Sequence, residues 1–159
     1  MTSPLLTFED VTIYPSDLEC LAPRQWLNDQ IISFAMARYE KKVFESGQPL
    51  RFLDASLVSC LRLQLEDEEE EEVAGFLEGM GLVTSSAVVV PLTNKTSFES
   101  TSSHWSLLYI DLTLPAALHY DSCHNSNGSA AEFTLKDIFT LLKRYFCTSI
   151  SCYELQLHF

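Results

Sequence analysis

Apolar residues recur at helical spacing over residues 25–44, where they form one face of an amphipathic helix. The positions on that face are Leu27, Ile31, Phe34, Ala35 and Tyr39. Pro23 precedes the segment, and Gly47 and Pro49 follow it, which favours a helix bounded by these residues. Residues 57–65 mix apolar and polar positions and predict a second, shorter helix.

The middle of the chain changes to a pattern that is typical of strands. Residues 87–92 are a continuous β-branched and aliphatic run, which indicates a strand buried on both faces. Residues 105–112 and 118–120 predict two more strands joined by a turn, with polar loops over 93–103 and 125–129. A helix over 134–146 and a strand over 150–157 complete the series. This order predicts an α+β domain with a mostly antiparallel central sheet.

Length and charge limit what such a domain does. A chain of 159 residues with 47% apolar residues is expected to be one domain with a real core. Its net charge of −12 argues against a nucleic-acid or anionic-membrane partner and favours a basic protein or peptide tail. We expect a monomer.

The cysteines and the N-terminus bear on location. The five cysteines are odd in number and widely spaced, as reduced thiols are, and the N-terminus lacks the features of a secretory signal. No apolar stretch is long enough to span a bilayer. The chain is therefore expected in the cytoplasm or the nucleus.

One low-complexity segment interrupts the pattern, a run of seven acids over residues 66–72. Like charges repel and stay solvated, so the run predicts a solvated loop or the start of a short helix over 73–77. A docking patch for a basic partner is the alternative.

The first candidate for chemistry is His104, which lies where a polar loop enters an apolar strand. Histidine titrates nearest neutral pH and is the usual general base, although a lone histidine at a strand end is more often structural. Asp121 follows the next strand. If the two residues face each other across an antiparallel pair, the turn must centre between Leu112 and Thr113. Asp121 would then accept the proton on Nδ1 of His104 and fix the imidazole tautomer.

Both tryptophans of the chain lie directly beside polar motifs. Trp26 precedes Leu27-Asn28-Asp29, and Trp105 follows His104. Tryptophan offers a wide, flat apolar wall that suits a slot for an extended peptide, although packing in the core is its usual role.

Taken together, these motifs resemble the ubiquitin-like-modifier proteases of the sentrin-specific (SUMO-protease-like) family, closest to its deneddylase branch. The residues that carry the resemblance are Trp26-Leu27-Asn28-Asp29-Gln30-Ile31-Ile32, His104-Trp105-Ser106-Leu107-Leu108 and His119-Tyr120-Asp121-Ser122, with weaker matches at Phe76-Leu77-Glu78 and residues 8–14. The resemblance spans about residues 5–146.

The resemblance implies a papain-like α+β cysteine-protease fold and cleavage after the C-terminal Gly-Gly of a ubiquitin-like modifier. It implies that His104 is the general base and Asp121 its orienting acid. Trp26 and Trp105 would line the Gly-Gly tunnel, and Asp29 would bind an arginine in the modifier's tail. A neddylation modifier is the expected substrate, with a SUMO-type modifier as the alternative.

The nucleophile departs from the family pattern. The resemblance implies a cysteine in a Gln…Asp-Cys-Gly stretch well after the aspartate, and no such stretch is present in this sequence. We expect the single domain to lack the C-terminal part that carries this cysteine, which leaves its activity uncertain. Cys123 and Cys152 stand in the wrong sequence context to replace it.

Two other interpretations remain beside the protease. In the first, the chain is a non-catalytic module that holds the modifier's tail through Asp29, Trp26 and Trp105 without cutting it. In the second, His119, Cys123 and His124 form a metal site, but they lack a recognised zinc spacing. No metal and no cofactor are expected.

Overall fold

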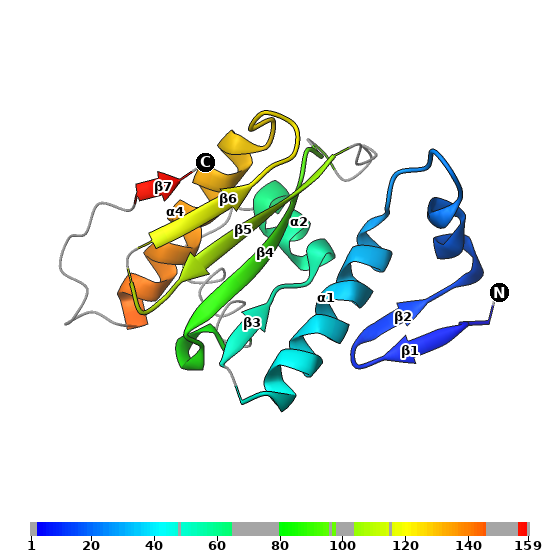
Figure 1. Ribbon diagram of the computed structural model, residues 1–159, viewed down its shortest axis with the longest axis horizontal. Coiled ribbons are helices and arrows are strands. Elements are labelled where there is room, and N and C mark those ends of the chain that lie inside the picture. The colour runs from blue at the N-terminus through cyan, green and yellow to red at the C-terminus, as the bar shows by residue number, and fades with distance from the viewer. Residues whose placement is uncertain are drawn as a thin grey trace.

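A computed structural model describes residues 3–47, 49–64, 80–95, 97, 104–114, 116–145 and 156–158. Three helices and seven strands are labelled in it, together with two short 3-10 helices (Figure 1). The helices are α1 (Asp29–Glu45), α2 (Ala55–Gln64) and α4 (Gly128–Tyr145), with η1 (Pro15–Leu21) and η2 (Leu82–Thr84). The strands are β1 (Leu6–Phe8), β2 (Val11–Ile13), β3 (Leu50–Phe52), β4 (Ala87–Thr93), β5 (Trp105–Asp111), β6 (Ala116–Tyr120) and β7 (Gln156–His158).

The main sheet has five strands in the order β3-β4-β5-β6-β7. Its centre, β4-β5-β6, is antiparallel, whereas β3 and β7 each add to it in parallel. The predicted α+β class with an antiparallel central ladder is therefore confirmed, with parallel pairing only at the two edges.

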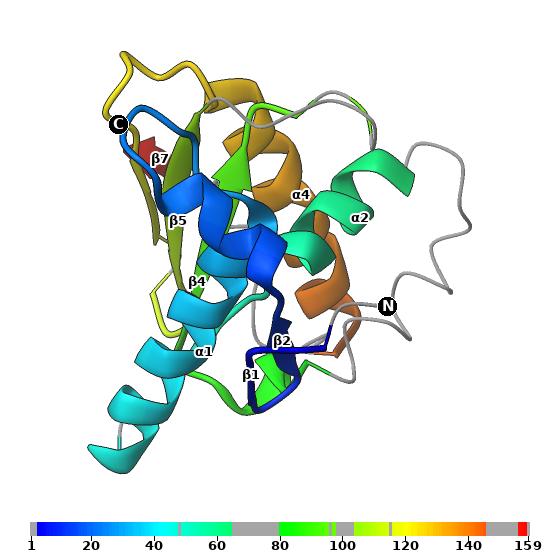
Figure 2. The same ribbon diagram turned by 90° about the vertical axis from the view of Figure 1, so that its right-hand side faces the viewer.

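The core lies between this sheet and the helices α2 and α4, which cover the same side of it (Figure 2). Strand β4 is buried along its whole length, as its continuous apolar run predicts. Strand β5 alternates instead, with Ser106, Leu108 and Ile110 buried and the residues between them partly exposed. Its buried face meets Ala131, Leu135 and Ile138 of α4. The alternation decides which side chains of β5 and β6 share a face.

Helix α1 begins at Asp29, four residues later than expected. Asn28 determines this start, because its Oδ1 accepts the backbone N–H of Ile31 at 2.9 Å, the bond of an N-terminal cap. Trp26 and Leu27 consequently lie in the irregular segment before the helix. The expectation that Pro23 marks the helix start is wrong, because the capping residue overrides it.

The other two helices, in contrast, begin earlier than the apolar pattern indicates. Asp54 accepts the N–H of Leu57 at 2.9 Å and starts α2 at Ala55 rather than at residue 57. Helix α4 starts at Gly128, inside the expected loop, because the carbonyl of Asn127 accepts the N–H of Ala131 at 2.9 Å. The start of α4 is thus brought against the end of β6.

The N-terminal residues form a separate hairpin, β1-β2, that packs on α1. The ring of Phe8 meets that of Phe34 edge-on at 6.0 Å, and the guanidinium of Arg38 lies 5.2 Å from the Phe8 centroid. Gln30 adds a hydrogen bond from Nε2 to the carbonyl of Thr12 at 2.8 Å. These contacts join the hairpin to the helix that begins at Asp29.

Several sequence predictions fall outside the described residues. They are the acidic run 66–72, the helix over 73–77, most of the loop 93–103 and the part of the last strand before Gln156. In the part of the chain that the structure describes, no helix combines the length and apolar character of a membrane span.

Candidate active site

His104 and Asp121 lie at the same end of the central ladder. His104 immediately precedes β5 and Asp121 immediately follows β6. Because side chains alternate along strands, positions 104 and 106 share one face, and so do 119 and 121. Their face is the one that α4 covers, since Ser106 and His119 are buried beside its start. The sheet thus directs both candidate residues to one place.

The register differs from the expected one. Leu108 pairs with His119, and continuing that register sets Asp121 opposite Ser106 rather than opposite His104. The predicted direct pairing of His104 with Asp121 is therefore wrong. Asp121 faces a position two residues after His104, because the turn lies further along the chain than Leu112–Thr113. The two side chains still meet diagonally, which strand geometry permits for longer side chains.

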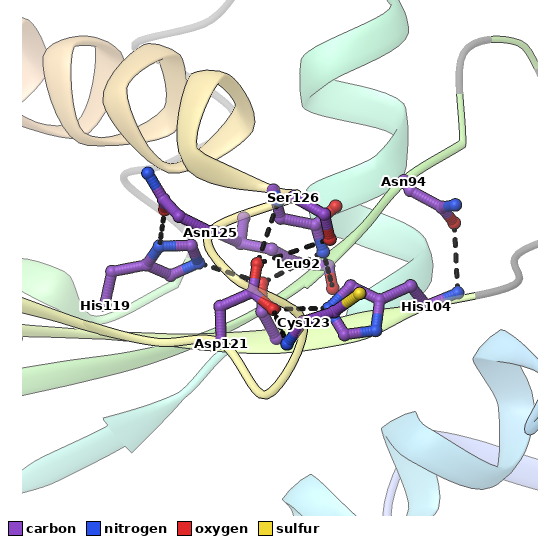
Figure 3. Close-up of polar contacts among 10 residues, drawn as sticks. Leu92, Asn94, His104, His119, Asp121, Cys123, Asn125 and Ser126 are labelled. Carbon is purple, nitrogen blue, oxygen red and sulfur yellow. Dashed lines mark hydrogen bonds and ion pairs between the residues drawn. The ribbon is translucent and has the colours of Figure 1, made fainter. Parts of the chain in front are cut away.

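The contact itself is short. Nε2 of His104 lies 2.6 Å from Oδ1 of Asp121, and the two side chains are 15% and 4% exposed (Figure 3). The bonded ring nitrogen is Nε2, whereas the sequence pattern led to the expectation of Nδ1. The carboxylate therefore fixes the tautomer that carries its proton on Nε2, in which the basic lone pair of the neutral ring is on Nδ1.

The loop after β6 wraps around the Asp121 carboxylate. Oδ1 also accepts the backbone N–H of Cys123 at 2.8 Å, and Oδ2 accepts that of Asn127 at 2.9 Å. The chain reverses at His124 and Asn125, whose φ angles of 47° and 62° lie in the left-handed region. Asparagine tolerates that region better than most residues. The turn brings Asn127 back to the carboxylate.

These donors keep Asp121 ionised. Burial alone raises the pKa of this carboxyl, but the backbone N–H groups of Asn127 and Cys123, together with His104, lower the pKa to about 2. A permanent negative charge beside the ring is what stabilises an imidazolium.

The backbone of His104 is also held. Its N–H donates to Oδ1 of Asn94 at 3.1 Å, and its carbonyl accepts the N–H of Asn94 at 3.3 Å (Figure 3). Asn94 directly follows β4, so this double contact continues the β4-β5 ladder past its last pair, Thr93 with Trp105. His104 is thereby held by its backbone on one side and by its ring on the other.

Trp105 links the ladder to the start of α1. Its indole N–H donates to the carbonyl of Leu27 at 2.9 Å, across 78 positions of sequence. Trp26, the neighbour of Leu27, is 63% exposed, a large fraction for so apolar a side chain. The structure thus places the segment that carries Trp26 against the residue that follows His104.

Asp29 already has a partner within the chain. Its Oδ2 lies 2.6 Å from Nζ of Lys95, with both side chains less than one quarter exposed. Asp29 is the first residue of α1, and Lys95 directly follows Asn94, which bonds to the backbone of His104, so this ion pair joins the start of α1 to the segment beside His104. An arginine in a modifier's tail would have to share Asp29 with Lys95 or displace it.

A buried polar cluster that the sequence did not predict adjoins the pair. It consists of Ser106, His119 and Asn127, which are 8%, 5% and 2% exposed. The periodicity contained a signal for it, because Ser106 and His119 alternate in phase with His104 and Asp121. No signal in the sequence indicated that Asn127 returns to join them.

The cysteines in the described part of the chain are Cys20 in η1, Cys60 in α2 and Cys123 in the loop after Asp121. Cys147 and Cys152 lie outside the described residues. Among the residues that the structure describes, no group of three potential ligands could hold a metal ion. His119 of the proposed metal cluster is instead bonded to Ser106 and Asn125.

The amino-acid sequence is similar to that of known proteins. Residues 25–156 match the model of the Ulp1 protease family, C-terminal catalytic domain. The probable sentrin-specific protease 8 of Dictyostelium discoideum is 32% identical over 153 residues, which cover 89% of this chain and 60% of that protein. The NEDD8-specific protease 2 of Schizosaccharomyces pombe is 26% identical over 148 residues, or 89% of this chain and 34% of the relative.

A solved structure shows the same fold. The Ulp1 protease domain in complex with Smt3, the yeast ortholog of SUMO, superposes with a TM-score of 0.70 at 22% identity. All of this chain and 66% of that one are covered. The chain thus spans about 60% of the first relative and about two thirds of the solved domain. Family model, relatives and fold agree that the chain belongs to the Ulp1 protease family.

Proposed function

We propose that the chain binds the C-terminal tail of a ubiquitin-like modifier, NEDD8 foremost, and acts as a cysteine protease that cleaves after its Gly-Gly. The observation that carries this proposal is the 2.6 Å contact of His104 with Asp121, made at the end of the ladder beside Trp105. The proposed site of action is the cytoplasm or the nucleus.

The chemical roles follow from the tautomer. With its proton on Nε2 held by Asp121, the ring of His104 accepts the thiol proton of a cysteine at Nδ1 and becomes an imidazolium that the carboxylate stabilises. The thiolate attacks the carbonyl carbon of the terminal glycine. The imidazolium then returns the proton to the departing lysine amine, and a water molecule hydrolyses the thioester by the same base.

The substrate class rests on the tail-binding residues and on the relatives. Exposed Trp26 and tethered Trp105 offer flat walls that suit glycines, which have no side chains to clash with them. The net charge of −12 suits a basic tail. The Schizosaccharomyces pombe relative is a NEDD8-specific protease, which favours NEDD8, whereas the solved Ulp1 domain binds a SUMO ortholog.

A second function needs only the tail contacts. With exposed Trp26, tethered Trp105 and the Asp29 carboxylate, the chain would hold the modifier's tail without cutting it, as a binding module. Both functions use the same tail contacts and differ only in whether a cysteine reacts.

A modifier with a cysteine-reactive C-terminal electrophile distinguishes the two. NEDD8 and SUMO forms of this probe are incubated separately with the folded chain, and the products are followed by intact-mass spectrometry. A one-to-one adduct with the NEDD8 probe, mapped to a single cysteine, is expected for the protease. Binding of NEDD8 without an adduct supports the binding module. If neither modifier binds, both functions are wrong.

Asp29→Asn is expected to weaken NEDD8 binding about tenfold or more, because a charged hydrogen bond to a tail arginine is worth about 1.5–3 kcal/mol. The substitution also removes the ion pair with Lys95, so Lys95→Met is the matched control. That control removes the ion pair but keeps the carboxylate. It should leave binding unchanged or strengthen it, because Asp29 no longer has an internal competitor. Isothermal titration calorimetry measures both. Equal losses in the two variants would show that Asp29 acts only through Lys95.

A further inference from the structure

His119 is a buried titratable residue that the proposed chemistry does not use. It lies in β6, two positions before Asp121, so the two side chains are on the same face of the sheet, and it is 5% exposed. Both of its ring nitrogens contact side chains. Nδ1 lies 3.0 Å from Oδ1 of Asn125 (Figure 3). Nε2 lies 3.0 Å from Oγ of Ser106.

Ser106 connects His119 to Asn127. The Nδ2 amide of Asn127 donates to Oγ of Ser106 at 3.0 Å and to the carbonyl of Leu92 at 3.4 Å. The backbone N–H of the same asparagine donates to Oδ2 of Asp121 at 2.9 Å. Asn127 therefore holds the carboxylate by its backbone while its side chain is held by Ser106 inside the core.

The directions of these bonds follow from the donors available. The Asn125 carbonyl oxygen can only accept, so Nδ1 of His119 donates to it. Ser106 accepts from Asn127, which leaves its single hydrogen to donate to Nε2 of His119. Neutral His119 with its proton on Nδ1 satisfies all of these contacts at once. The serine hydroxyl thus has one defined direction, and so does the amide that donates to it.

We infer that His119 is a positioning residue for the His104–Asp121 pair, acting through Ser106 and Asn127 on the second oxygen of Asp121. The inference deepens the proposed function and rests on it for the meaning of the pair. The physical reason is burial. Polar groups withdrawn from water cost free energy unless they are hydrogen-bonded, so removing one member of the cluster leaves its neighbours to reorient. When the Asn127 side chain reorients, its own backbone N–H, which donates to Asp121, moves with it.

Two substitutions at position 119 separate positioning from packing. His119→Leu fills much of the space but leaves the Ser106 hydroxyl without its acceptor. His119→Gln places a side-chain amide near the former Nε2, where its oxygen can accept from Ser106. Ser106→Ala removes only a hydroxyl and tests the same connection if His119→Leu does not fold. Glu132→Gln and Ser122→Ala are the controls, since both residues are exposed, the first on α4 and the second in the loop after β6.

The readouts are the carboxyl pKa of Asp121, from ¹³C NMR, and the downfield proton signal of the short His104 Nε2–H bond. In His119→Leu and Ser106→Ala we expect the pKa of Asp121 to rise by about one unit and the proton signal to shift upfield or broaden. In His119→Gln and the controls both should stay near their wild-type values.

Wild-type values in folded His119→Leu, or in Ser106→Ala, would overturn the inference. A rise in His119→Gln equal to that in His119→Leu would also overturn it, because the effect would then follow the ring and not the bond. Neither readout needs a modifier. If the Asp121 pKa is unchanged in the variants while the wild-type chain forms the adduct, only the positioning role is wrong. If the Asp121 pKa rises as expected but no modifier binds, only the proposed function is wrong.

Discussion

His104→Ala is expected to slow adduct formation with the NEDD8 electrophile by about 10²–10⁴-fold, the contribution typical of a positioned general base. The reason lies in the pair at 2.6 Å, which holds Nε2 and so assigns proton transfer to Nδ1. Without the imidazole, a cysteine reacts only through the thiolate that it forms unaided. The rate of mass increase under excess probe measures the effect.

Glu132→Ala is the control for this prediction. Glu132 is exposed on α4, and its removal should leave the rate within about twofold of wild type, as expected for a surface substitution. Circular dichroism of both variants excludes unfolding as the cause of a loss. A His104→Ala variant that reacts at the wild-type rate would show that the adduct forms on a cysteine outside this site.

Asp121→Asn is expected to lower the free energy of unfolding at pH 7 by about 2–3 kcal/mol. A shift of the carboxyl pKa from 3.8 to about 2 corresponds to that free energy, and the side chain is 4% exposed. The amide is isosteric but cannot replace the carboxylate. Both oxygens of Asp121 accept N–H groups, so either orientation of the amide turns its own N–H toward another donor.

The pH dependence provides a sharper test of Asp121. Its folded pKa is depressed, so its stabilisation is fully present above the unfolded pKa of about 3.9 and is lost as the pH falls toward 2. The difference in stability between wild type and Asp121→Asn should therefore persist from pH 7 to about 5 and shrink below about 4. Urea denaturation at a series of pH values measures it. A constant difference down to pH 2.5 would mean that the ionised carboxylate is not its source.

Local patterns in the sequence were sufficient to predict the central antiparallel strands and the contact between His104 and Asp121. The unbroken, β-branched apolar run of β4 predicted a buried strand, and a histidine and an aspartate at the ends of consecutive strands predicted a contact between the two side chains. The register could not be predicted, because shifting the pairing by two residues keeps the same side chains on the buried face. The apolar pattern therefore does not distinguish the two registers. The contact formed regardless, since side chains of this length also reach diagonally.

Caps and long-range partners explain what the sequence did not predict. The start of α1 depends on one side-chain bond at Asn28, which outweighs the nearby proline. Lys95 pairs with Asp29 across 66 positions, and nothing in the pattern around either residue specifies the other. The same is true of Asn127, whose role depends on a left-handed turn at His124 and Asn125 that only the structure shows.

The short sequence separation of His104 and Asp121 has a consequence for the order of folding. The two residues are 17 positions apart on one hairpin, whereas the bond from Trp105 to Leu27 spans 78 positions. Closing a short loop loses less chain entropy and happens sooner than closing a long one. During refolding, His104 and Asp121 should meet while the segment that carries Trp26 is still unattached, so the proposed catalytic pair matures before the proposed tail-binding wall.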